Sequence, residues 1–220
     1  MDKIRIILDG MITTMNHVKP PRMTALRELR EAENGSPLSI LIGTILSART
    51  RDESTSSVVR ELFSKYKTAR SLARAKLSDV EKIIKRTGFY HVKAKRIIEV
   101  ASIIDSKYSG LVPKTMEELI NLPGVGRKTA NCVLVYAFDE PAIPVDTHVH
   151  RISNRLGLVK TKIPEDTEVE LMKKIPKKYW IRINDTFVMY GQNICKPVSP
   201  MCQVCQIKKE CSYYRTRFSS

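Results

Sequence analysis

The segment that most restricts the fold is MEELINLPGVGRKTANCVLVYAF, at residues 116–138. On both sides of LPGVG, apolar residues recur at three- and four-residue spacing, which predicts two helices. Pro123 cannot continue the first helix, and Gly124 and Gly126 permit the positive φ angles of a very tight turn. The second helix is expected to begin near Arg127. The sequence therefore predicts a helix-hairpin-helix, although an ordinary corner between two helices fits the same pattern.

The rest of the chain shows the same helical spacing of apolar residues. The segments that carry it include SPLSILIGTILSAR, ESTSSVVRELFSKY, LSDVEKIIKRTG and VKAKRIIEVASIIDSKY. Helix ends are predicted at Gly88, Gly110 and Gly157. Thr115 followed by Glu118 forms a capping-box pattern at a helix start. Because no run of alternating β-branched residues indicates a strand, we expect an all-α fold with mostly short connections.

The charge of the chain indicates a polyanionic partner. Lys and Arg number 38 against 23 Asp and Glu, which gives a formal net charge of +15. Nucleic acid is favoured over a membrane surface because no strongly basic amphipathic anchor stands out, although a generally basic surface is the simpler alternative. No stretch approaches the roughly 18 apolar residues of a membrane helix, and the first residues lack the features of a secretory signal. We therefore expect a cytoplasmic protein, associated with the nucleoid.

Lys128 stands in the first turn of the second predicted helix of the hairpin. The positive end of the helix dipole, the neighbouring Arg127 and burial in a cleft would each lower the pKa of its amine. A neutral amine can attack an electrophilic carbon, which makes Lys128 a candidate nucleophile. The exposed backbone N–H groups of the turn can bind a phosphate without reading sequence. A solvated, phosphate-binding lysine is therefore the open alternative for Lys128.

Asp146 follows two prolines in PAIPVDTHVHRISNRLGL and stands at or near the start of the next predicted helix. Aspartate is a common N-cap residue, so helix capping alone explains its presence. A carboxylate held there could also stabilise positive charge on a sugar ring or help to deprotonate an attacking amine. The two roles are compatible. For the nearby His148 and His150, local hydrogen bonding is a commoner role than catalysis or metal binding.

The cysteines indicate a metal site. Cys132 lies in the apolar run CVLVYAF and is expected to be a small buried core residue. The other four have the spacing C-x6-C-x2-C-x5-C and are Cys195, Cys202, Cys205 and Cys211. Without a secretory signal, such clustering favours a metal over disulfides. Four thiolates suit tetrahedral zinc or a four-iron cluster, and the presence of a single CxxC pair favours the cluster.

These motifs together resemble the endonuclease III family, the helix-hairpin-helix DNA glycosylases with a lysine nucleophile. The resemblance rests on LPGVGRKTAN, VDTH and the four-cysteine tail, and it extends from about Pro37 to Cys211. It implies a two-domain, all-α fold. Residues 30–140 would form a six-helix barrel domain with the hairpin. Residues 1–29 and 141–220 would form a discontinuous helical domain ending in a [4Fe–4S] cluster loop, with a cleft between the domains.

The resemblance also implies an activity. A monomer would bind double-stranded DNA and flip the damaged base into the cleft. Lys128 would attack C1′, the base would leave, and a Schiff base would form. β-Elimination would then nick the strand, while Asp146 faces Lys128 across the cleft. The implied substrates are oxidised pyrimidines such as thymine glycol, and abasic sites.

Further residues are expected to contact DNA by the same resemblance. They are Leu122, Gly124, Val125, Gly126 and Arg127 in the hairpin, together with Arg49, Asp52, Phe89 and His148. Arg49 stands where the family usually has a glutamine that fills the gap left by the flipped base; an arginine there could pair with the orphan base. Asp52 is expected to orient the sugar or cap a helix. Phe89 is expected to wedge into the duplex or to pack in the core.

Two other functions fit part of the sequence. A mismatch-specific glycosylase of the same fold would remove adenine or mismatched thymine, but such relatives typically lack a lysine at the position of Lys128. A non-catalytic, DNA-binding or redox-sensing iron–sulfur protein would explain the charge, the hairpin and the cysteines. It gives no reason for Lys128 and Asp146 to occur together.

Overall fold

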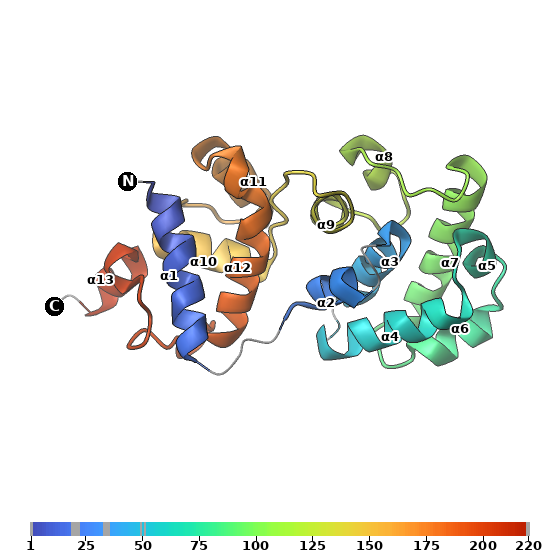
Figure 1. The fold of residues 1–220 in the computed structure, drawn as a ribbon, viewed down its shortest axis with the longest axis horizontal. Coiled ribbons are helices and arrows are strands. Elements are labelled where there is room, and N and C mark those ends of the chain that lie inside the picture. Colours follow the sequence, from blue (N-terminus) through green and yellow to red (C-terminus); the bar gives the residue numbers. More distant parts are fainter. Residues whose placement is uncertain (1, 19–22, 33–35, 49, 51, 219–220) are drawn as a thin grey trace. The chain divides into compact units, whose positions relative to one another are not determined.

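The computed structural model describes residues 2–18, 23–32, 36–48, 50 and 52–218, with residues 52–54 described through their backbone alone. Within these residues the chain forms helices and no strands, so the predicted all-α fold is confirmed (Figure 1). None of the described helices combines the length and the apolar character needed to cross a membrane. The α-helices are α1 (Lys3–His17), α2 (Ala25–Ala32), α3 (Pro37–Ser47), α4 (Asp52–Lys65), α5 (Ala69–Ala73), α6 (Leu77–Ile84), α7 (Tyr90–Lys107), α8 (Met116–Ile120), α9 (Arg127–Phe138), α10 (Thr147–Leu156), α11 (Pro164–Lys174), α12 (Trp180–Asn193) and α13 (Ser212–Phe218). The short 3₁₀ helices are η1 (Lys177–Tyr179) and η2 (Lys208–Glu210).

The chain divides into two compact units. We call residues 25–140 the hairpin unit, and residues 1–24 with residues 141–220 the cysteine unit. The predicted division into two domains stays a prediction. Its bounds were residues 30–140 for one domain and residues 1–29 with 141–220 for the other.

The hairpin unit is built around α3. Every side chain from Leu38 to Leu46 is buried, because α3 packs against α2, α4, α7 and α9 on different sides. A helix covered on all sides needs no polar face, which explains its largely apolar sequence. At Gly43 a Cβ atom would lie 2.6 Å from Cδ1 of Leu29, so glycine allows α2 its close approach.

The cysteine unit joins the two ends of the chain. In Figure 1, α1 lies beside α12, and α12 also packs against α10. The cysteine-bearing segment is held to α1, where the backbone N–H of Gln206 donates to Oγ1 of Thr14 over 3.1 Å. Ile207 is buried and lies so close to Gly10 that a Cβ atom there would be 2.5 Å from it. Helix α1 therefore supports the segment that carries the clustered cysteines.

Most of the predicted helix ends are found, and one is wrong. Gly110 and Gly157 have φ angles of +82° and +73°, the left-handed values that end a helix. Helix α6 instead ends at Ile84, and the left-handed residue that follows is Phe89, with φ of +58°, and not Gly88. Thr87 explains the difference, because its backbone N–H and its hydroxyl each donate to the carbonyl of Ile84 over 2.8 Å. These bonds end the helix in a turn before the glycine.

Candidate active site and metal centre

The hairpin consists of α8, a turn at residues 121–126, and α9. Thr115 caps α8 as predicted, accepting a hydrogen bond from the backbone N–H of Glu118. In the turn, the N–H of Val125 donates to the carbonyl of Leu122 over 3.1 Å, and both of these side chains are buried. The buried side chains of Leu122 and Val125 therefore stabilise the turn. Only the backbone of these two residues is available for the predicted DNA contacts.

The two glycines of the turn differ in their roles. Gly124 has a φ of +73°, and a Cβ atom there would lie 2.2 Å from Cδ of Arg96. Gly126 has an ordinary φ of −93° and is the N-cap of α9, and a Cβ atom there would meet nothing within 4 Å. The expectation of a left-handed conformation is therefore confirmed for Gly124 and wrong for Gly126. Both glycines are exposed, so the turn presents backbone to the surface.

Lys128 lies in the first turn of α9, directly after the exposed Arg127. Its side chain is partly buried. The backbone N–H groups of a first helical turn have no partner inside the helix, and they form the positive end of its dipole. Lys128 therefore stands where an anionic group of a ligand would be attracted, at the surface of the hairpin unit.

Asp146 is the N-cap of α10, so the capping interpretation is confirmed. Its Oδ1 accepts hydrogen bonds from the backbone N–H groups of His148 and Val149, both over 2.8 Å. The approach to the cap is held by Asn184, whose Nδ2 donates to the carbonyl of Pro144 over 2.7 Å. These contacts fix the orientation of the carboxylate. Asp146 belongs to the cysteine unit and Lys128 to the hairpin unit, and their predicted meeting across a cleft stays a prediction.

The two histidines after Asp146 make local hydrogen bonds, as expected. His148 lies with its Nδ1 3.1 Å from Nη2 of Arg151, and His150 with its Nδ1 2.7 Å from Oγ1 of Thr167. The same Arg151 Nη2 donates to the carbonyl of Cys195 over 3.0 Å. His148 is thus linked through Arg151 to the backbone of the first clustered cysteine. DNA contact by His148 stays a prediction.

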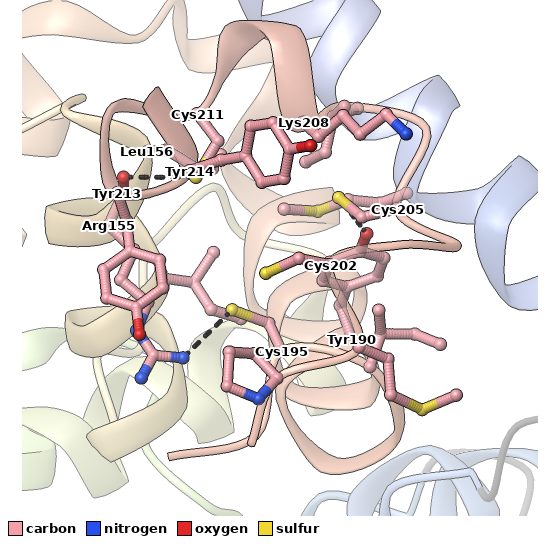
Figure 2. A pocket seen from close by; sticks show the side chains of 16 residues that line it. Arg155, Leu156, Tyr190, Cys195, Cys202, Cys205, Lys208, Cys211, Tyr213 and Tyr214 are labelled. Carbon is pink, nitrogen blue, oxygen red and sulfur yellow. Dashed lines mark hydrogen bonds between the residues drawn. The ribbon is translucent and has the colours of Figure 1, made fainter. Parts of the chain in front are cut away.

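The four clustered cysteines line one pocket of the cysteine unit (Figure 2). Apolar side chains such as Met11, Ile152 and Ile207 form much of its wall. Burial raises the pKa of the thiols of Cys202, Cys205 and Cys211, and the nearness of Cys195 and Cys211 raises that of Cys202 further. Among the described residues, no three metal-binding side chains converge closely enough to hold an ion as they stand.

The chemistry of this pocket nevertheless suits a group bound by four sulfur atoms. The hydroxyl of Tyr190 donates to Sγ of Cys205 over 3.0 Å, and Nη1 of Arg155 donates to Sγ of Cys195 over 3.4 Å (Figure 2). Such donors stabilise negative charge on ligating sulfur. Arg155 also donates to the carbonyl groups of Lys196 and Pro197, over 2.7 and 2.8 Å. The pocket therefore offers four thiols, and the sulfur atoms of Cys195 and Cys205 accept hydrogen bonds from oriented side chains.

Of the other expected DNA contacts, Phe89 is the one with a described side chain. It is 63% exposed, so the alternative of a core aromatic is wrong. Arg49 and the side chain of Asp52 lie outside the described residues. The backbone of Asp52 begins α4.

Sequence reasoning missed Lys93, whose side chain is only 5% exposed. A signal for its burial is present in the sequence. Lys93 precedes Ile97, Val100 and Ile104 at helical spacing, and these three residues form the buried stripe of α7. Arg151 and Arg155 were missed as well, because no sequence pattern shows that one face of α10 meets the cysteine segment.

Comparison with known proteins places these features in one family. The model of the HhH-GPD superfamily of base excision DNA repair proteins matches residues 42–177. Endonuclease III of Thermotoga maritima is 50% identical over 188 residues, which cover 86% of this chain and 88% of the relative. A trapped covalent intermediate of endonuclease III with DNA is 36% identical with a TM-score of 0.77, covering 88% of this chain and 95% of that one. A thermostable thymine-DNA glycosylase is 27% identical with a TM-score of 0.81, covering 96% of each chain.

Proposed function

The chain belongs to the endonuclease III family of the HhH-GPD base excision repair proteins, and from this we propose that it removes oxidised pyrimidines such as thymine glycol from double-stranded DNA through Lys128. Membership makes the chain a DNA glycosylase and abasic-site lyase. The observation that carries the assignment of the nucleophile is the position of Lys128. It follows the exposed turn of the hairpin directly, in the first turn of α9.

The proposed reaction has four steps, and in each of them the bonds that form and break can be named. The neutral amine of Lys128 bonds to C1′ while the bond from C1′ to the base breaks, and the departing base takes up a proton. The sugar ring then opens to leave an imine between Nζ and C1′. Loss of a proton from C2′ expels the 3′ phosphate and cuts the strand. Water finally hydrolyses the imine and restores the lysine.

Asp146 supports the first step in this proposal. Both capping bonds fall on Oδ1, and no hydrogen bond to Oδ2 is found within the described part of the chain. Oδ2 therefore keeps its lone pairs for the substrate, while the cap holds the carboxylate in one orientation. There it stabilises the positive charge that develops on the sugar ring or accepts a proton from the attacking amine.

Binding of the DNA backbone is assigned to the hairpin. The exposed backbone at Gly124 and Gly126, with the first N–H groups of α9, suits a phosphate group. Arg127 is exposed beside them and adds a positive charge. Contacts of this type bind DNA of any sequence, which a repair enzyme requires.

The four clustered cysteines are proposed to hold a [4Fe–4S] cluster. The ligands would be Cys195, Cys202, Cys205 and Cys211, with Tyr190 and Arg155 as hydrogen-bond donors to two of the sulfur atoms. When bound, the cluster ties the cysteine segment into a fixed loop. Brown protein with absorbance near 400 nm and about four irons per chain is expected. Colourless protein with one zinc would contradict the cluster but keep the four ligands.

The experiment that tests the function is a base-release and nicking assay on duplexes that carry single modified bases. Each lesion is paired in turn with all four opposite bases. We expect release of thymine glycol and related oxidised pyrimidines, followed by nicking. Lys128→Ala should lose both steps while retaining DNA binding. Absence of release from every oxidised pyrimidine would overturn the substrate assignment.

A second function is favoured by one comparison, the similarity to a thymine-DNA glycosylase. In that case the enzyme would remove an undamaged base from a mismatch. Two further duplexes, with thymine opposite guanine and adenine opposite guanine, are added to the panel to separate the two functions. Release of these normal bases without release of oxidised pyrimidines would establish the second function.

A further inference from the structure

Lys93 connects three segments of the hairpin unit. It lies in the first turns of α7, and its Nζ donates to the carbonyl of Leu46 and to Oγ1 of Thr50, both over 2.7 Å. Leu46 is in the last turn of α3, and Thr50 lies in the connection between α3 and α4. The side chain of Lys93 therefore holds the end of α3 and Thr50 against α7.

Phe89 is the N-cap of α7, one turn before Lys93. Its carbonyl accepts the regular helical hydrogen bond from the backbone N–H of Lys93 over 3.1 Å. Phe89 is an exposed aromatic residue in the left-handed conformation, which costs on the order of 1 kcal/mol for a non-glycine residue. Val92, one turn further along, is 54% exposed. Two apolar side chains are thus exposed to solvent at the start of α7, the helix that Lys93 joins to α3.

Folding alone gives little reason for a lysine at this position. Burial lowers the pKa of Lys93 to about 8, and no carboxylate among the described side chains pairs with it. The carbonyl end of the α3 dipole offers only partial compensation. An apolar residue of similar size would not need to remove a charged amine from water. Replacing buried charged groups by apolar ones often leaves protein stability unchanged or raises it. Perturbed buried groups of this kind concentrate at functional sites.

We infer that Lys93 is a positioning residue for base removal, which keeps the end of α3 and Thr50 fixed to the start of α7, beside Phe89, in the one arrangement that fits a duplex opened at the damaged base. This inference rests on the proposed function and on the DNA contacts that the sequence predicts for Arg49 and Phe89. Opening a duplex and flipping a base costs a few kcal/mol. Segments that are already in place lower the cost of reaching that state.

The consequence is a difference between two substrates. A paired lesion must be flipped out before Lys128 can attack, whereas an abasic site has no base to unstack or unpair. Loss of the Lys93 contacts should therefore slow base release from a paired lesion much more than nicking of a preformed abasic site. If Lys93 had a purely structural role, its replacement would slow the reactions of both substrates equally.

The test compares Lys93→Met with Lys95→Met, an exposed lysine on the same helix that loses the same charge. Rates are measured in single turnover with saturating enzyme, on a thymine glycol duplex and on an abasic duplex. For Lys93→Met we expect base release about tenfold slower or more, with nicking of the abasic site within twofold of the original rate. Lys95→Met should leave both rates unchanged. Equal slowing on the two substrates, or no slowing on either, would overturn the inference.

A second measurement compares how readily trypsin cleaves the chain between α3 and α4. Arg49 and Arg51 stand on either side of Thr50 in the sequence and provide tryptic cleavage sites. Under native conditions Lys93→Met should be cut there several times faster than the original chain or Lys95→Met, while circular dichroism shows the same helix content. If Lys93→Met does not fold, Lys93→Gln, which keeps an N–H donor without the charge, takes its place in both assays with a smaller effect expected. Unchanged cleavage would contradict the holding role even if the original chain released no oxidised pyrimidine.

Discussion

At Asp146, Oδ1 accepts both bonds of the helix cap, and Oδ2 accepts none from the described residues. Asp146→Asn separates capping from catalysis, because asparagine caps a helix as well as aspartate but carries no charge. We expect base release about 10²-fold slower. The thermal unfolding midpoint should stay within a few degrees of the original, as roughly 1 kcal/mol would shift it by about 2–4 °C. Full activity of this variant would reduce Asp146 to a cap.

At Lys93, the lowered pKa predicts how stability changes with pH. Below pH 8 the amine of Lys93 is protonated in both the folded and the unfolded chain. The free-energy cost of burying its charge is therefore independent of pH in this range. Between a pKa of about 8 in the folded chain and the ordinary 10.5, the folded chain loses the proton first. The unfolded state then binds more protons, and the free energy of unfolding rises with pH.

The pH effect is isolated by subtracting the free energy of unfolding of Lys93→Met at each pH. From pH 7 to pH 9 we expect the difference to move by about 1 kcal/mol in favour of the original chain. Urea unfolding followed by circular dichroism at both pH values measures it. A constant difference, or one that moves the other way, would show that the charge is not buried.

Among the elements, the hairpin turn depends on Gly124 for both conformation and space. In Gly124→Ala the new Cβ would be in a left-handed conformation and 2.2 Å from Arg96. We expect a loss of about 1–3 kcal/mol in the free energy of unfolding and weaker DNA binding. Gly126→Ala is the matched control, because its φ is −93° and the space is open. Chemical denaturation and a DNA titration compare them; equal effects of the two changes would contradict this account of the turn.

The elements also show what the sequence can and cannot predict. Apolar spacing predicted the helices, and Thr115 was correctly predicted as a cap, because both signals are local. The helix end at Gly88 was predicted wrongly because buried bonds from Thr87 outweigh the local preference for glycine. The buried Lys93 stands at the start of the apolar stripe of α7, and its acceptors are Leu46 in α3 and Thr50 after it. No local rule identifies partners so distant in sequence.

For the whole molecule, the order of the motifs was enough to indicate the family, but not which helices meet. That α1 packs on α12 follows from no local pattern. The same holds for the contact between Gly10 and Ile207, which joins the cysteine segment to α1. The excess of basic residues, by contrast, is a property of the entire chain and was visible from composition.

That excess predicts binding that depends strongly on salt. A net charge of +15 and contacts with several phosphates release counterions from DNA when the complex forms. Affinity for an undamaged duplex should therefore fall at least about tenfold between 50 and 200 mM salt. Fluorescence anisotropy over a salt series gives the slope, and uncharged osmolyte at the same osmolality is the control. A slope near zero would exclude the phosphate backbone as the main contact.

The central claim is that the amine of Lys128 becomes covalently bound to the sugar during the reaction. It is tested most directly by adding borohydride to the protein with a duplex that carries thymine glycol, and mapping the linked peptide by mass spectrometry. We predict a reduced adduct on Lys128, which is absent in Lys128→Ala and forms on no other lysine of the original chain. A reaction that releases the base without any adduct, or an adduct on a different residue, would contradict the claim.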